Sequence, residues 1–217
     1  MAVLTTRMLL LGAVAMFEPV NGYQIRRELT SWGVDEWANL GAGSIYGGLT
    51  TLEKLGQVRR HDVADDGRPV AVYEITPVGR EELARLIGDG LETVTPFNQV
   101  AFQAAFGMLP LIDRPTARRH LEVRAEGLRA VRAMPEDKTA YAPPHASAGL
   151  ELWLRSVDLE IGWVDDTVAA LDAGQMTLAG EPWDWAPPSD DPGWQMHRDR
   201  ERYRELLGRV SADGAGA

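Results

Sequence analysis

The first apolar positions of the chain have the spacing of helices rather than strands. A nearly continuous apolar run predicts a buried helix over residues 5–17. Asn21 is then expected to cap a second helix over residues 22–32, since its side chain can accept a hydrogen bond from a free N–H in the first turn. We expect Tyr23, Ile25 and Leu29 of this second helix to pack inward.

The third expected helix, over residues 43–56, is the one around which the rest is organised. Ser44 is expected to cap it and Gly56 to end it in the left-handed conformation. One side carries an apolar stripe of Ile45, Leu49, Leu52 and Leu55. The opposite side is small and polar, with Tyr46, Gly47, Thr50, Thr51 and Lys54. Such a helix suits a DNA major groove, and an ordinary surface helix is the alternative.

The hydrophobic period then changes from helical to extended. Residues 58–63 and 70–75 read as two strands, and the Asp66-Gly67 pair between them is a strong hairpin signal. Thr76-Pro77 is expected to open the next helix, with threonine as the cap and proline in the first turn. Helix, helix, helix, two-stranded hairpin and helix is the order of a winged helix-turn-helix domain.

The remaining half of the chain reads as all helical. Helices are expected over residues 95–108, 117–134 and 194–210. Between them runs a coiled-coil seam with alternating gaps of four and three residues: Leu150, Leu154, Val157, Ile161, Val164, Val168 and Leu171. The fold class is therefore mostly α with a small β-hairpin wing. We expect a DNA-binding domain over residues 1–90 and a helical dimerisation and effector domain over residues 91–217.

Three stretches together resemble the PadR family of bacterial transcription regulators. They are G-Y-Q-I, G-S-I-Y-G-G-L-T-T-L-E-K-L-G and D-G-R-P-V-A-V-Y-E-I-T-P-V-G-R-E-E-L, and the resemblance covers about residues 8–87. It implies a cytoplasmic regulator, most often a repressor, that binds double-stranded DNA as a homodimer made by the C-terminal helices. The chain departs from the family pattern at the third helix, where Lys54 is the only basic residue.

The expected DNA contacts come from the second helix, the third helix and the wing. Hydroxyl and cationic side chains can bind phosphates or base edges, and the methyl group of threonine can contact thymine. The candidates are Arg26, Ser44, Tyr46, Thr50, Thr51, Lys54, Arg59, Arg60 and Arg68. The alternative for all of them is a solvated surface.

The charge distribution keeps a second function open. The chain of 217 residues has a net charge of −10, which argues against binding nucleic acid through bulk charge. Residues 1–87 hold nine basic and eleven acidic residues, a net of −2, and the other −8 lies in the C-terminal part. A winged helix that binds protein and has lost specific DNA contact is therefore the alternative function.

Other chemistry has little support in the sequence. Gly41, Gly43 and Gly47 resemble a loosened dinucleotide fingerprint, but no strand is expected before them. No histidine has metal-ligand spacing, there is no cysteine, and we expect no catalytic site, no cofactor and no membrane span. The apolar residues after Arg7 resemble a short signal peptide, although a buried helix fits better. Trp153 is a candidate contact for a small apolar or aromatic effector.

Overall fold

The structure is a computed structural model in which the chain forms two compact units. The first unit comprises Met1–Leu86 with Trp183–Ala217, and the second comprises Ile87–Pro182. The residues that the structure describes are 2–95, 98–133, 142–182, 186, 188–191 and 193–214. The expected boundary near residue 90 lies close to this division, but the structure groups the last segment of the chain with the first unit.

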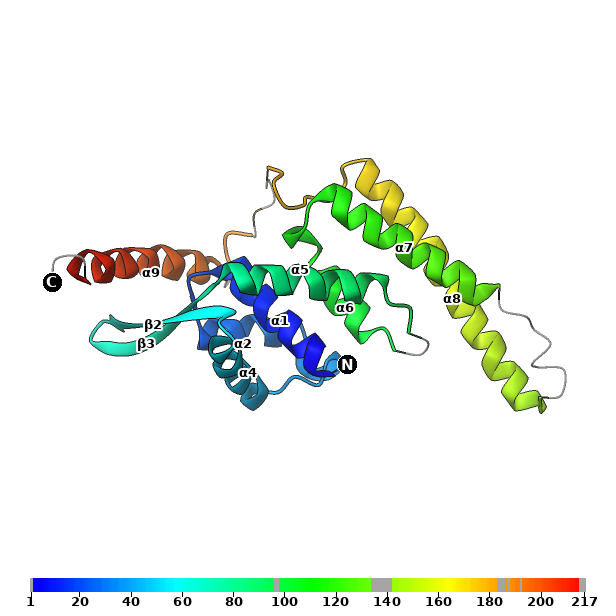
Figure 1. Cartoon of the computed structure of the whole chain (residues 1–217), viewed down its shortest axis with the longest axis horizontal. Coiled ribbons are helices and arrows are strands. Elements are labelled where there is room, and N and C mark those ends of the chain that lie inside the picture. Colours follow the sequence, from blue (N-terminus) through cyan, green and yellow to red (C-terminus); the bar gives the residue numbers. More distant parts are fainter. Residues whose placement is uncertain are drawn as a thin grey trace. The chain divides into compact units, whose positions relative to one another are not determined.

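The first unit begins with the helices that the apolar spacing predicts. They are α1 (Ala2–Phe17), α2 (Gly22–Ser31), the short α3 (Val34–Trp37) and α4 (Ala42–Lys54). Figure 1 shows α1 and α2 in blue and α4 in dark teal. Leu9, Leu10 and Leu11 of α1 are all buried, as expected for a helix that is apolar on every side. No helix was expected between residues 32 and 43, so the short α3 in that segment is a correction.

Asn21 caps α2 as predicted, and it does so with a reciprocal partner. Its side chain accepts a hydrogen bond from the backbone N–H of Gln24 at 2.8 Å, and the Gln24 side chain accepts one from the Asn21 N–H at 3.0 Å. This capping box fixes the start of α2. Tyr23 was expected to pack inward but is 58% exposed, because the buried face of α2 runs through Gly22, Ile25 and Leu29.

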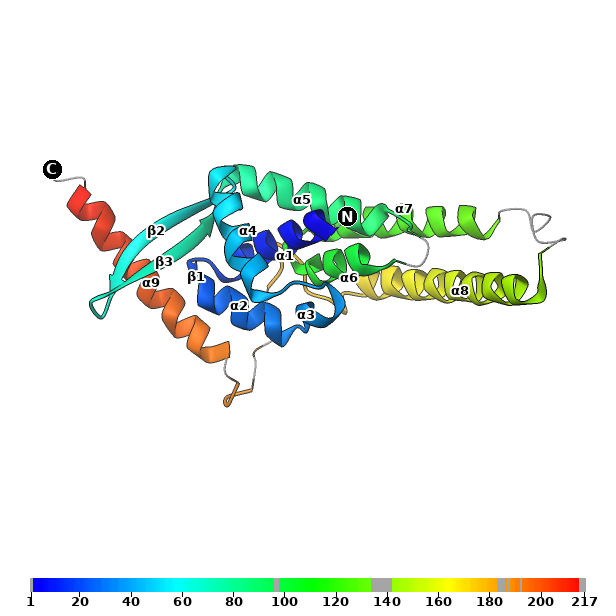
Figure 2. The same cartoon turned by 90° about the horizontal axis from the view of Figure 1, so that it is seen from below.

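The wing is a three-stranded antiparallel sheet rather than the expected two-stranded one. Strands β2 (Val58–Asp65) and β3 (Arg68–Ile75) form the hairpin, and β1 (Val20–Asn21) pairs with β3 on its other side (Figure 2). Asp66 and Gly67 both have positive φ, 48° and 77°, which is the two-residue turn that an Asp-Gly pair favours. A two-residue strand is too short to be seen in the hydrophobic pattern.

Two further helices complete the first unit. Helix α5 (Pro77–Glu92) starts in the first unit. Thr76 Oγ1 accepts a hydrogen bond from the Gly79 N–H at 3.1 Å, so the predicted threonine cap is confirmed. Helix α9 (Gly193–Gly214) was expected to belong to the C-terminal domain. It instead packs against β1 and β2 of the sheet, as Figures 1 and 2 both show.

The second unit is all helical in its described residues. It contains α6 (Val100–Gly107), the 3₁₀ turn η1 (Leu109–Leu111), α7 (Arg114–Arg132) and α8 (Pro144–Asp172), together with the end of α5. Helices α7 and α8 pack against each other along most of their length (Figure 2). Helix α6 starts later than expected, at Val100. Within the described part of the chain, no helix has both the length and the apolar character needed to cross a membrane.

Candidate nucleic-acid interface

Helix α4 has one buried face and one outward face, as its spacing predicts. Ile45, Leu49 and Leu52 are at most 2% exposed and pack α4 against α1, α2 and β2. The outward side chains are all exposed: Tyr46, Thr50, Thr51 and Lys54. Leu55 was expected to extend the buried stripe, but it is the C-cap residue and 51% exposed, because the helix ends before Leu55 turns inward.

The start of α4 differs from the prediction. Gly41 is the N-cap, with extended backbone angles and no side-chain hydrogen bond, and the helix begins at Ala42. Ser44 therefore lies in the first helical turn and is exposed, rather than capping the helix. The capping preference of serine did not decide where the helix starts. Alanine has the highest helix propensity, and Ala42 is the first helical residue, upstream of Ser44. As an exposed first-turn residue, Ser44 remains on the candidate surface.

The two threonines of α4 have their hydroxyl protons engaged within the helix. Thr50 donates to the Tyr46 carbonyl at 3.1 Å, and Thr51 donates to the Gly47 carbonyl at 2.9 Å. The hydroxyl oxygens can still accept a hydrogen bond, and the methyl groups can still make apolar contact. The threonines are therefore better suited to a base amino group or a thymine methyl than to donating to a phosphate.

The adjacent glycines Gly47 and Gly48 have different roles. A side chain at Gly48 would collide with Leu10 of α1, so this glycine permits the close approach of α1 and α4. A Cβ at Gly47 would meet nothing within 4 Å. Packing therefore does not require glycine at position 47, although glycine costs about 1 kcal/mol in a helix relative to alanine.

Tyr23 and Arg26 form part of the same surface from α2. The guanidinium of Arg26 lies 5.6 Å from the centre of the exposed Tyr23 ring. The ring of Tyr46 lies over the start of α2, where a Cβ at Gly22 would be 3.0 Å from Tyr46 Cε1. Tyr23 was not among the expected contacts, and the helical spacing of Gly22, Ile25 and Leu29 was the signal that would have placed it outside.

The strand register separates the basic residues of the wing onto two faces. In the register of the hairpin, Arg59 lies opposite Glu74 and Arg68 lies opposite Asp65. Side chains alternate between the two faces of a strand, so both arginines lie on the face that also carries Val63. Arg60 pairs with Tyr73 on the opposite face. The three candidate arginines of the wing therefore do not all lie on one face of the sheet.

Lys54 is less neutralised than Arg60 of the wing. Arg60 donates to Asp62 Oδ1 from Nη2 at 2.7 Å and from Nε at 3.0 Å, and this exposed pair raises the pKa of Arg60. Arg59 lines a shallow pocket together with Glu18 and Glu74. Lys54 makes no ion pair with any described residue and is exposed at the end of α4.

Part of the expected dimerisation seam on α8 packs against α7 of the same chain. Val157, Val164 and Leu171 are at most 5% exposed on the helix that packs against α7. The other seam residues, Leu150, Leu154, Ile161 and Val168, are half-buried. Two apolar side chains of α8 that remain outside lie on a different line: Leu152 is 69% exposed and Leu159 is 76% exposed. Trp163, further along that line, is 40% exposed and also packs edge-on against Phe102 and Phe106 of α6.

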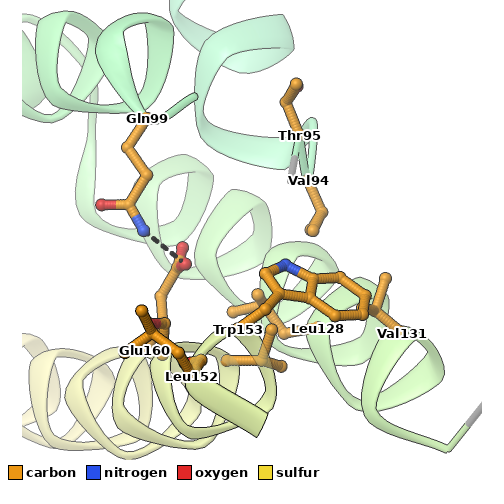
Figure 3. Close-up of a pocket in the computed structure, with 10 residues that line it drawn as sticks. Val94, Thr95, Gln99, Leu128, Val131, Leu152, Trp153 and Glu160 are labelled. Atoms are coloured by element: carbon orange, nitrogen blue, oxygen red, sulfur yellow. Dashed lines mark hydrogen bonds between the residues drawn. The ribbon is translucent and has the colours of Figure 1, made fainter. Parts of the chain in front are cut away.

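Trp153 lines a pocket between α7, α8 and the segment that follows α5. The pocket has a volume of about 350 Å³, and its walls include Val94, Leu128 and Val131 (Figure 3). Glu160 forms a polar edge, where its carboxylate accepts a hydrogen bond from Gln99 Nε2 at 2.8 Å. An indole beside aliphatic side chains with one polar edge is a suitable surface for a flat apolar ligand. No cluster of histidine, aspartate and glutamate that could hold a metal ion occurs among the described residues.

Comparison with known proteins identifies the part of the chain that carries this surface. Residues 10–85 match the model of the transcriptional regulator PadR-like family, which confirms the resemblance seen in the sequence. No curated protein matches the sequence.

Three solved structures that resemble the chain give the following comparisons. The PadR-like transcriptional regulator BC1756 from Bacillus cereus is 20% identical, with a TM-score of 0.34, and the match covers 76% of this chain and 94% of that one. Bacillus subtilis PadR in complex with operator DNA is 16% identical, with a TM-score of 0.35 and coverage of 76% and 98%. The protein smu.1604c from Streptococcus mutans UA159 is 18% identical, with a TM-score of 0.35 and coverage of 78% and 97%.

Proposed function

We propose that this chain is a cytoplasmic transcriptional repressor that binds operator DNA as a homodimer and is released by a small apolar or aromatic effector. The proposal rests on the outward face of α4 within the PadR-like domain. Tyr46, Thr50 and Lys54 offer an acceptor, a methyl group and a cation on a helix whose other face is fixed by burial. The small residues at this face allow the helix backbone to approach the groove closely.

The role of α4 can be tested through the salt dependence of DNA binding. Lys54→Ala is expected to weaken binding to duplex DNA and to reduce the slope of log Kobs against log salt by about one unit, because one phosphate contact and its released counterion are lost. Arg60→Ala is expected to weaken binding with a smaller change in slope, because Asp62 already neutralises part of its charge. Fluorescence anisotropy over a range of salt concentrations measures both slopes.

Arg118→Ala is the matched control for these variants. Arg118 is about half exposed on α7 and pairs with Glu122 and Asp172, so its loss removes a surface arginine outside the proposed interface. Its slope should equal that of the wild type. If the wild-type protein shows no salt-dependent binding to any duplex, the alternative of a protein-binding winged-helix module replaces the proposal.

The homodimer is proposed from the exposed apolar residues of α8. Leu152, Leu159 and Trp163 lie at positions i, i+7 and i+11 on a helix of 29 residues, and a second copy would remove them from water. A two-fold partner is also what places two recognition helices in successive major grooves.

A charge in this stripe should prevent assembly. Leu159→Asp is expected to convert a dimer into a monomer of about 23.8 kDa, because burying an unpaired carboxylate is strongly unfavourable. Val123→Asp, at a 40% exposed position of α7 outside the stripe, should leave the mass of the dimer unchanged. Light scattering gives both masses, and a monomeric wild-type protein at micromolar concentration would contradict the proposed dimer.

The effector is proposed to bind beside Trp153. The supporting observation is the pocket of about 350 Å³ in the second unit, with an indole, aliphatic walls and a polar edge at Glu160. A ligand releases DNA only if it binds one conformation of the protein better than another.

A further inference from the structure

The wing has an apolar face that the hairpin cannot bury by itself. Val63 and Val72 are 5% and 0% exposed, although both lie on a hairpin that projects from the helices (Figure 2). They are covered by α9, where Tyr203 is 3% exposed and Leu206 and Leu207 pack around the same cluster. Helix α9 is therefore a structural part of the wing.

Polar contacts fix α9 at the same position. The Tyr203 hydroxyl accepts a hydrogen bond from Asn21 Nδ2 at 2.7 Å, and Asp199 accepts one from Gln24 Nε2 at 2.7 Å. Asn21 and Gln24 are the two members of the capping box of α2. Arg200 donates to the last carbonyl groups of α1. One helix thus ties together α1, the start of α2 and the wing.

The tip of the hairpin is acidic, and α9 supplies its counter-charge. Asp65 and Asp66 stand next to Arg68, so the turn alone carries two carboxylates and one guanidinium. Arg202 of α9 binds both carboxylates, with its Nη2 atom 2.6 Å from Asp66 Oδ1 and also in contact with Asp65 Oδ1. With Arg202 in place the four side chains sum to zero charge.

We propose that Arg202 is a positioning residue of the DNA interface, which neutralises the Asp65–Asp66 tip so that Arg68 can approach the phosphate backbone. On this account α9 belongs to the DNA-binding unit, and it acts through the wing rather than by touching DNA. The inference rests on the proposed function, because an uncompensated carboxylate at the tip matters only near a polyanion.

A charge-balanced pair of variants tests this role. Arg202→Ala is expected to weaken duplex binding about two- to five-fold at low salt, since it leaves one uncompensated negative charge within screening distance of the phosphates. Arg202→Ala combined with Asp66→Asn restores the net charge of the tip. The double variant should regain the affinity and the salt slope of the wild type.

The same variants distinguish neutralisation of the tip from direct phosphate contact and from loss of bulk charge. If Arg202 contacts a phosphate itself, the double variant will stay weak and its salt slope will stay lower by about one unit, which overturns the proposal. Arg204→Ala removes an exposed arginine of α9 that makes no ion pair with any described residue. If it weakens binding as much as Arg202→Ala, loss of bulk charge accounts for both results and the proposal is wrong.

A readout that does not involve DNA shows whether the wing or the proposed function has failed. Tyr203→Ala should increase hydrogen exchange of the β2 and β3 amides in the full chain, whereas Arg202→Ala should leave their protection unchanged. If the wild-type protein binds no DNA while this exchange pattern holds, the proposed function is wrong, and the proposed role of Arg202 in DNA binding is wrong as well. If Arg202→Ala alone exposes the wing, its role is structural and the proposal is overturned.

Discussion

Arg124→Ala is expected to lower the free energy of unfolding of the second unit by about 3–5 kcal/mol, because it breaks a buried ion pair. Arg124 is 2% exposed on α7, and its Nε donates to Glu160 Oε1 at 2.7 Å. Its Nη1 donates to the carbonyl groups of Leu91 and Thr93, and its guanidinium lies 3.8 Å from the centre of the Phe102 ring. Removing it leaves a nearly buried carboxylate and two carbonyl groups without this partner.

Urea unfolding followed by circular dichroism measures this loss, and Arg129→Ala is its control. Arg129 is on the same helix and pairs with Asp165 at 2.6 Å, but both side chains are about half exposed. Loss of such a surface pair costs about 1 kcal/mol or less. Equal destabilisation by the two variants would show that Arg124 is not the buried centre of this unit.

Gly79→Ala is expected to destabilise the first unit by about 3 kcal/mol, although the same change in an ordinary helix stabilises it. Gly79 lies in the first turn of α5, where a Cβ would be 2.8 Å from Ile75 Cγ1 and 2.9 Å from the Gln57 carbonyl carbon. The Gln57 carbonyl also accepts a hydrogen bond from the Thr76 N–H at 3.0 Å, so it cannot move away freely. A thermal unfolding scan should show a lower midpoint.

Gly47→Ala is the matched control, since no atom lies within 4 Å of the added Cβ. It should raise stability by about 0.5–1 kcal/mol through helix propensity alone. On the proposed function it should also weaken DNA binding, because the methyl group would stand between α4 and the groove. Unchanged stability in Gly79→Ala would mean that the start of α5 does not pack against Gln57, the residue before β2, as closely as in the structure.

The parts of the fold that local spacing controls could be predicted from the sequence. The buried face of α4, the Asp66-Gly67 turn and the threonine cap of α5 each depend on residues only a few positions apart. The winged helix-turn-helix order follows from these elements taken along the chain. The outward face of α4 was predicted for the same reason, since a helix with a known inner stripe has a known outer one.

The parts that depend on distant partners could not be predicted. Arg124 reads as a surface residue of a charged helix, and only its contacts with Glu160 and Phe102 account for its burial. The helix of Tyr203 reads as polar, and its place under the wing depends on residues about 140 positions earlier in the chain. The seam on α8 fits either a partner chain or α7, and hydrophobic spacing does not distinguish the two.

The central claim is that α4 and the wing bind a specific DNA sequence, and selection of random duplex fragments by the purified wild-type protein tests it most directly. A homodimer with two recognition helices should enrich a sequence with two related half-sites about one helical turn apart. Its affinity should fall linearly with salt on a logarithmic scale. Recovery of no preferred sequence, together with no salt-dependent binding to any fragment, would contradict the account.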